Sequence, residues 1–433
     1  MGRPSLVSRH DVSRRERPRR CGCRLTRVGH GLVTSGAAAV LPAAEEHRQE
    51  RAGQVVPHRE HGCRERGLRG GGEVGLREGR RERRVLHANL DRGRARSLVG
   101  AAADASGQVT EEVTEQVVAD DHGDDEGAGR QDLADGSPFY MEGPRLHEFL
   151  QEMHGEVFEG RGAIFTVGET PGVLLENAPL YSDPARHEVN MIFQFEHVGL
   201  GLPEGKFGRR TLEAGDLADS LTRWQKGLAE RGWNSLYLCN HDQPRTVSRF
   251  GDEKYWYDSA TALATILHLL RGTPYIYQGE ELGMTNTVFA GIEDFEDIES
   301  TNYYRVAIEH GDDPERVLEG LRAMGRDNAR TPVQWDASDN AGFTTGTPWI
   351  ALNPNYPVIN ASEQVGDPVS VFSYFRALIR LRHHLPVIAD GRFERIDVGH
   401  REIFAFRRTL GERELVVIAN LSSKDLAPVL SSE

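Results

Sequence analysis

The chain has 433 residues, a formal net charge of −14 and 38% hydrophobic residues. A net charge of that sign repels polyanions, so it argues against a nucleic acid or an anionic membrane as partner and favours a small neutral substrate. No run of 18 apolar residues occurs, and the basic N-terminus lacks the apolar stretch of a secretory signal. The composition therefore argues against a membrane-spanning or secreted protein.

Aromatic residues occur only from Phe139 onward, a part that holds all 16 Phe, 11 Tyr and 5 Trp. Residues 1–138 also lack Ile and Lys, and residues 1–100 contain 23 Arg. The remaining Val, Leu and Ala are too sparse to offset a backbone ordering cost of roughly 1–2 kcal/mol per residue. We expect residues 1–135 to be disordered, or to be a mistranslated segment, since a GC-rich gene read in a wrong frame gives such a composition.

Two other functions of this N-terminal segment are weakly indicated. Its arginines could form a nucleic-acid-binding arm, and a metal could bind at a cluster formed by Cys21, Cys23, His30 and Cys63. The cysteine spacing matches no zinc pattern, and we expect neither a metal nor a cofactor. Cys239 is the single cysteine after residue 63, so the fold does not depend on disulfides, which indicates a reducing, cytoplasmic location.

From residue 136 onward, helices and strands are predicted in alternation. Apolar residues at helical spacing predict a helix over 146–157, and short apolar runs predict buried strands at 163–167 and 189–193. The following elements are a helix at 216–231, a strand at 235–239, a helix at 261–270 and a strand at 274–277. This alternation favours parallel β/α units.

The last third of the chain is predicted to be more irregular. Residues 283–366 are rich in Asn, Asp, Gly and Pro and are expected to form a long loop with short helices, before a helix at 367–383. Alternating apolar residues around Gly411, within 393–430, predict antiparallel hairpins. We therefore divide the globular part into a partial α/β barrel at 136–385 and a small β domain at 386–433.

Polar residues follow three of the predicted strands directly: Glu169, the pair Glu196-His197, and the triplet Asn240-His241-Asp242. In a parallel β/α barrel such positions meet at one rim, where active sites lie. Breaking a glycosidic bond requires a carboxylic acid that protonates the leaving oxygen and groups that stabilise positive charge at the sugar carbon. Taken singly, a Glu after a strand is more often a helix cap and an Asn-His-Asp an ordinary turn.

Five segments in this order resemble the α-amylase family of glycoside hydrolases, within it the oligo-1,6-glucosidase and α-glucosidase branch. They are Thr166-Val-Gly-Glu-Thr-Pro-Gly-Val, Val189-Asn-Met-Ile-Phe-Gln-Phe-Glu-His, Asn240-His-Asp-Gln-Pro-Arg, Gln278-Gly-Glu-Glu-Leu-Gly-Met-Thr and Arg326-Asp-Asn-Ala-Arg-Thr-Pro-Val-Gln-Trp-Asp. The resemblance covers about residues 136–433 and implies the C-terminal half of a (β/α)8 TIM barrel, about strands five to eight, followed by a β domain.

The resemblance also implies roles for four residues. Glu169 would be the general acid/base, and Asp242 the third carboxylate, which holds sugar hydroxyls and favours the distorted transition state. His241 would hydrogen-bond the same sugar, and Arg330 would line the neighbouring +1 subsite. Glu196, Gln278 and Glu280 are weaker candidates for the rim. Phe165, Phe193 and Phe195 are expected in the barrel core, and Cys239 as a buried apolar residue.

The chain departs from the family pattern at the nucleophile. The family carries an Asp in Gly-Phe-Arg-x-Asp some 55 residues before the acid, whereas this chain reads Gly107-Gln-Val-Thr-Glu-Glu-Val-Thr there. Glu111, Glu112 or Glu115 lacks the apolar neighbours that would hold it roughly 5–5.5 Å from the acid. We therefore expect an inactive fragment of a retaining α-glucosidase for short oligosaccharides. A sugar- or partner-binding protein without catalysis, a glucosyl transferase and a sucrose isomerase remain alternatives, and the sequence leaves the oligomeric state open.

Overall fold

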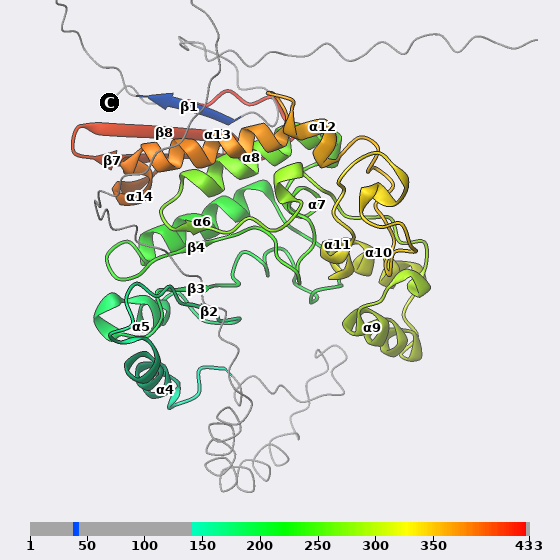
Figure 1. The fold of residues 1–433 in the computed structure, drawn as a ribbon, viewed down its shortest axis with the longest axis horizontal. Coiled ribbons are helices and arrows are strands. Elements are labelled where there is room, and N and C mark those ends of the chain that lie inside the picture. The colour runs from blue at the N-terminus through cyan, green and yellow to red at the C-terminus, as the bar shows by residue number, and fades with distance from the viewer. Residues whose placement is uncertain (1–37, 43–140, 430–433) are drawn as a thin grey trace, which may run out of the picture. The chain divides into compact units, whose positions relative to one another are not determined.

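The computed structural model describes residues 38–42, as backbone only, and residues 141–429 (Figure 1). The long N-terminal segment expected to lack structure therefore lies outside the described residues, apart from Ala38–Pro42. In the part that the structure describes, no helix is both long and apolar enough to cross a membrane.

Four short parallel strands in chain order position the candidate residues. Strand β2 (Val167–Glu169) pairs with β3 (Met191–Phe193), and β4 (Ser235–Leu236) pairs with β5 (Thr273–Pro274). A parallel bridge between Ile192 and Asn234 joins the two pairs. All four strands therefore end at the same edge, which confirms the predicted parallel arrangement.

Helices follow these strands and cover them. Helix α5 (Ala178–Ser182) follows β2, and α6 (Ala214–Gly227) follows β3. Helices α7 (Thr246–Phe250) and α8 (Trp256–Leu269) follow β4. Helix α8 is buried at every residue from Ser259 to Leu269 because it packs against both α13 (Val371–His384) and the C-terminal sheet.

The C-terminal strands form the predicted antiparallel hairpins. Strands β6 (Arg392–Ile396), β7 (Ile403–Leu410) and β8 (Arg413–Asn420) pair in sequence, with Gly411 at a φ of 60° in the β7–β8 turn. Strand β1 (Ala38–Pro42) pairs antiparallel with the other edge of β8. The expected lack of order is therefore wrong for these five residues, because β8 offers them an unpaired edge.

One hydrophobic core joins the helices to this sheet. It contains Leu221 of α6, Leu267 of α8 and Phe375 of α13 together with Phe406 of β7 and Val417 of β8, each 5% exposed or less. Side chains on both sides of the predicted boundary at residue 385 thus share one core.

Two sequence predictions differ from the structure in detail. The helix predicted over 146–157 is confirmed, as helix α4 (Leu146–Met153) followed by one π-helical turn, but the strand predicted at 163–167 is displaced to β2. The Asn190 side chain accepts the backbone amide of Thr166 at 2.7 Å, which occupies a donor that a longer strand would use. Phe165 is 57% exposed, so its expected place in the barrel core is wrong.

Residues 283–366 hold longer helices than predicted. Helices α9 (Ile298–Glu309) and α10 (Pro314–Met324) have 12 and 11 residues and pack on a second core with Phe289 and Phe295. Short helices in or after this region are α11 (Asp327–Arg330), α12 (Ala361–Val365) and α14 (Pro386–Asp390). Single 3₁₀ turns lie at 184–186, 253–255, 280–282, 292–294 and 339–342.

Candidate active site

Glu169 is the last residue of β2 and has an exposed side chain. The turn that follows is fixed by Thr170, whose amide and hydroxyl donate to the Phe193 carbonyl at 3.2 and 3.1 Å. The pKa of Tyr237, just beyond β4, is raised first by burial and then by the negative charge of Glu169. The Glu169 carboxylate therefore acts electrostatically on the chain beyond β4, although β3 lies between the two strands.

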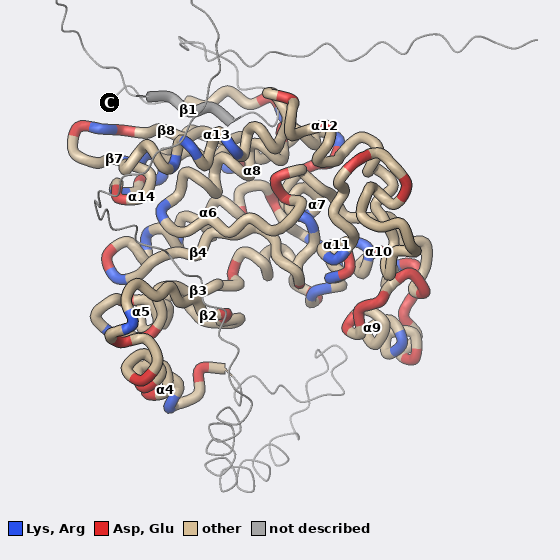
Figure 2. Tube along the Cα trace, viewed as in Figure 1, with Lys and Arg blue, Asp and Glu red and all other residues tan. Residues whose placement is uncertain are grey.

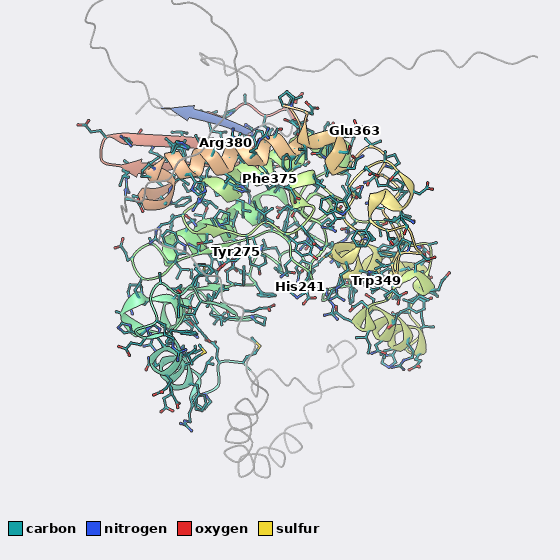
Figure 3. The ribbon with its side chains drawn as sticks, viewed as in Figure 1. His241, Tyr275, Trp349, Glu363, Phe375 and Arg380 are labelled. Carbon is teal, nitrogen blue, oxygen red and sulfur yellow. The ribbon has the colours of Figure 1, made fainter. Side chains whose placement is uncertain are left out.

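The candidate residues after β4 are placed by a local turn. The chain runs from β4 through the buried residues Tyr237–Cys239, and the Asn240 side chain then accepts the Asp242 amide at 2.8 Å. This is an Asx turn, which reverses the chain and presents the next side chains at the strand edge. His241 Nε2 lies 3.5 Å from Asp242 Oδ2, and the His241 side chain is 64% exposed. In the view of Figure 3, His241 is seen between Tyr275 and Trp349.

Arg330, the last residue of α11, binds both of these residues. Its Nη2 lies 2.7 Å from Asp242 Oδ1, and its Nε donates to the His241 carbonyl at 3.1 Å. Its Nη1 donates to Asp297 Oδ1 at 3.1 Å. The structure therefore brings together three of the four predicted site residues, His241, Asp242 and Arg330.

Two further charged residues complete this array and were not predicted. Arg326 lies 2.9 Å from Asp297 Oδ1 and 3.6 Å from Asp242 Oδ1. Burial acts to raise the pKa of Asp297, which is 3% exposed, but the hydrogen bond and charge of Arg326, with Arg330, outweigh it and lower that pKa. Asp297 is thus a buried anion between two arginines. Figure 2 shows the acidic stretch before α9 close to the basic residues of α11.

The sequence held a signal for Arg326 but none for Asp297. Arg326 and Arg330 are four residues apart, so even one helical turn puts their side chains on the same face. Asp297 lies in the irregular part of 283–366, where no periodic pattern marks its orientation. Its place depends on a long-range contact, because Asp327 Oδ2 accepts the Asp297 amide at 3.0 Å.

The weaker candidates point to other partners. Glu196 pairs with Arg223 and accepts from Trp224 Nε1 at 3.0 Å, both on α6. Glu280 is 6% exposed and accepts from the Thr246 hydroxyl at 2.9 Å; burial raises its pKa to about 7. Glu169 and Asp242 follow strands that are not neighbours, since β3 lies between β2 and β4.

A buried guanidinium holds the loops behind the array. Arg245, with an exposure of 0%, donates to the carbonyls of Gln278, Asn328 and Ala329 at 2.7, 3.0 and 3.1 Å. It therefore links the loop after β4, the loop after β5 and helix α11, which ends in Arg330. Cys239, next to this cluster, is 2% exposed, as expected of a buried apolar residue.

No group of three or more His, Cys, Asp or Glu residues within 141–429 is arranged to hold a metal ion. The cysteines and histidine weighed as a metal site, Cys21, Cys23, His30 and Cys63, lie outside the described residues.

Comparisons with known proteins find similarity to sugar-processing enzymes. A family model described as "Alpha amylase, catalytic domain" matches residues 109–391. The oligo-1,6-glucosidase of Parageobacillus thermoglucosidasius is 54% identical over 294 residues, which is 67% of this chain and 52% of that protein. The glucan 1,6-α-glucosidase of Streptococcus pneumoniae is 47% identical over 288 residues, 65% of this chain and 54% of that protein.

Two solved structures have a similar fold. A mutant of the trehalose-6-phosphate hydrolase of Bacillus licheniformis, in complex with PNG, has a TM-score of 0.64 at 43% identity, covering 68% of this chain and 53% of its own. An isomaltulose synthase variant from Erwinia rhapontici, in complex with D-glucose, has a TM-score of 0.63 at 39% identity, covering 66% and 53%. This chain spans about half the length of the curated relatives it matches.

Proposed function

Since the chain belongs to the α-amylase family, we propose that residues 136–433 supply the acid/base half of a retaining α-glucosidase for short α-1,6- or α-1,4-linked glucosides. The contact of Arg330 with both Asp242 and His241, past the end of β4, carries this proposal. The parallel strands β2 to β5 would correspond to strands five to eight of a (β/α)8 barrel, with the active site at their carboxyl ends.

In this mechanism Glu169 protonates the glycosidic oxygen as the bond breaks, and then accepts a proton from water. Its position as an exposed last residue of β2 lets a sugar approach the carboxyl group. No sugar is needed to order the turn beneath it, because Thr170 already fixes that turn.

Asp242 and His241 would hold the hydroxyls of the sugar whose anomeric carbon reacts. The Asp242 Oδ1 atom binds Arg330, while Oδ2 lies 3.5 Å from His241 Nε2 and accepts no hydrogen bond from the residues at 141–429. Oδ2 can therefore accept a sugar hydroxyl while the guanidinium keeps the carboxylate in one orientation. Arg326 and Arg330 lie next to Asp242 Oδ1 and would meet the leaving sugar.

The covalent step requires a second carboxylate that attacks the anomeric carbon. The chain contains no Gly-Phe-Arg-x-Asp motif, and the carboxylates Glu111, Glu112 and Glu115 lie outside the described residues. We therefore propose that the chain by itself binds glucosides without turning them over. A sugar-binding protein would behave in the same way. The two candidate functions therefore differ in whether residues 136–433 become catalytic once a nucleophile is supplied.

A chimera distinguishes these functions. The N-terminal half of the Parageobacillus oligo-1,6-glucosidase, which supplies a nucleophile, is joined to residues 136–433, and glucose release from isomaltose is measured. We expect turnover, and we expect Glu169→Gln to reduce it by about 10²–10⁴-fold, the usual range for a lost general acid. Turnover that survives this substitution would show that Glu169 is not the acid. A folded chimera that binds isomaltose without turnover would favour the binding protein.

A further inference from the structure

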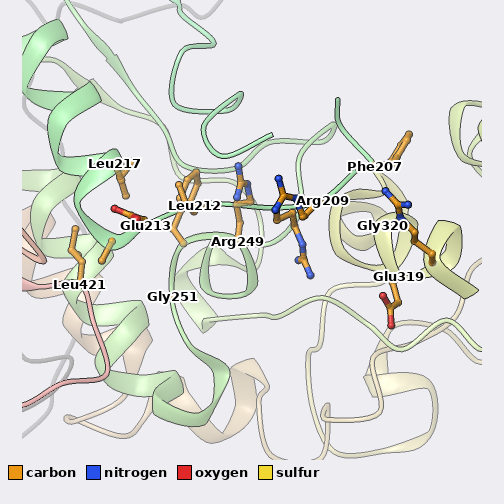
Figure 4. Close-up of a pocket in the computed structure, with 15 residues that line it drawn as sticks. Phe207, Arg209, Leu212, Glu213, Leu217, Arg249, Gly251, Glu319, Gly320 and Leu421 are labelled. Atoms are coloured by element: carbon orange, nitrogen blue, oxygen red, sulfur yellow. The ribbon is translucent and has the colours of Figure 1, made fainter. Parts of the chain in front are cut away.

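A cavity apart from the candidate active site is lined by several arginines. It has a volume of about 660 Å³ and lies between the loop after β3, the end of α7 and helix α10. Arg209, Arg210, Arg249 and Arg316 line it, and none of the candidate site residues does. Figure 4 shows Arg209 and Arg249 near its middle, with Glu319 at one end and Leu421 at the other.

The carboxylates close to this cavity neutralise only part of its charge. Glu204 lies 3.3 Å from Arg209 and 3.0 Å from Arg316, so these two arginines share one partner. Glu213 lines the cavity but is bound to Arg401 at 2.5 Å. Within residues 141–429, neither Arg210 nor Arg249 forms an ion pair with a carboxylate. Glu319 also lines the cavity, but within the described residues it forms no ion pair with either of them. Arg210 and Arg249 are therefore two cations without an ion-pair partner in one concave site.

Arg249 is held in place without an anion. Its Nη2 donates to the carbonyls of Val198 and Leu200 at 3.4 and 2.5 Å, and the guanidinium lies over the Phe250 ring, 5.1 Å from its centroid. Burial first, and then the positive charge of Arg210, lower the pKa of Arg249 to about 10. An anion placed between the two guanidinium groups would relieve this repulsion.

We propose that this cavity binds a phosphate group, as inorganic phosphate or as the monoester of a small metabolite, between Arg210 and Arg249. Guanidinium groups bind phosphate oxygens through paired N–H donors. Arg249 is half-buried and Arg210 is exposed, so a phosphate can reach both from solvent. The remaining volume, walled by Phe207, Leu212 and Leu421, leaves room for the organic part of an ester.

The full chain is titrated with inorganic phosphate, glucose 6-phosphate and glucose by calorimetry in a phosphate-free buffer. We expect inorganic phosphate and glucose 6-phosphate each to bind saturably at one site, and glucose not to bind there. Glucose 6-phosphate should bind more tightly than phosphate if the apolar lining contacts its sugar. Arg210→Gln should weaken phosphate binding about tenfold, which corresponds to one charge-assisted hydrogen bond.

Arg209→Gln is the matched control, since it removes the same charge from an arginine already paired with Glu204, and we expect at most about a twofold change. Arg249→Lys keeps the charge and loses the paired donors, so it should also weaken binding; urea unfolding monitors whether it folds. Absence of saturable binding, or equal effects of Arg210→Gln and Arg209→Gln, would overturn the proposal. The readout is phosphate binding rather than glucoside turnover, so its failure leaves the proposed function untouched.

Discussion

Replacing Arg245 by Met should destabilise the chain and weaken sugar binding at the same time. The substitution removes the guanidinium that binds the buried carbonyls of Asn328 and Ala329 and the carbonyl of Gln278, in a partly buried contact. A buried polar group that loses its partner costs about 1–3 kcal/mol, so the loss of partners for two buried carbonyls and a partly buried one adds up to several kcal/mol. We therefore expect a loss of about 3–5 kcal/mol in the free energy of unfolding, measured by urea denaturation of the full chain.

The effect on binding follows from the connection to α11. Asn328 and Ala329 directly precede Arg330, so their release frees the residue that orients Asp242. Isomaltose binding, measured by calorimetry under conditions where the variant is folded, should weaken about tenfold, the equivalent of one lost charge-assisted hydrogen bond.

Arg408→Met provides a matched control for this experiment. Arg408 is also 0% exposed and donates to backbone carbonyls, among them that of Ile388 at 2.9 Å, but it lies on β7 in the C-terminal sheet. It should lower stability by a similar amount and leave isomaltose binding unchanged. If Arg245→Met costs less than about 1 kcal/mol, or weakens binding no more than Arg408→Met, the proposed link between Arg245 and the site is wrong.

Three other predictions follow from the charged groups of the site. The full chain should release no glucose from p-nitrophenyl α-glucoside; turnover that Glu169→Gln abolishes would show that a group within the chain serves as nucleophile. Asp297→Asn should weaken isomaltose binding severalfold, because Arg326 and Arg330 lose the anion that separates them, and an unchanged affinity would count against this array. The pKa of Glu280, about 7 against an ordinary 4.5, means that the folded chain binds this proton more tightly than the unfolded chain. As the pH rises from about 4.5 to 7, the free energy of unfolding should therefore fall, by up to about 3 kcal/mol. Glu280→Gln should flatten that pH dependence.

The sequence predicted the parts of this molecule whose signals are local. The spacing of Leu217, Leu221 and Trp224 marked α6, and the alternation around Gly411 marked the β7–β8 hairpin. It also placed His241 and Asp242 after a strand, because a short apolar run ends directly before them. These features depend on residues a few positions apart. Hydrophobic periodicity and the preferences of turn-forming residues predict such local features well.

The parts that it missed depend on contacts between distant segments. Asp297 reaches the site only because α9 and α11 are tied together through Asp327, 30 residues away. The pairing of β1 with β8 joins segments almost 400 residues apart, and no local sequence pattern predicts that pairing. The displacement of β2 has the same origin, since the Asn190 side chain takes a backbone donor of Thr166.

The charged array around Asp242 explains why its members belong together. A single carboxylate faces two guanidinium groups, with Arg330 at 2.7 Å and Arg326 at 3.6 Å, and both arginines also bind the buried Asp297. Glu299 also lies 3.2 Å from Arg326 and is itself paired with Lys206 at 2.6 Å. Asp242 and Asp297 thus balance Arg326 and Arg330, so the low exposure of Asp297 does not leave an unpaired charge. Because Arg245 binds the carbonyls of the two residues before Arg330, the backbone that carries Arg330 is held in place. A sugar hydroxyl that binds Asp242 Oδ2 therefore meets a carboxylate whose orientation is already set. The entropy cost of ordering the Asp242 side chain arises during folding and does not weaken sugar binding.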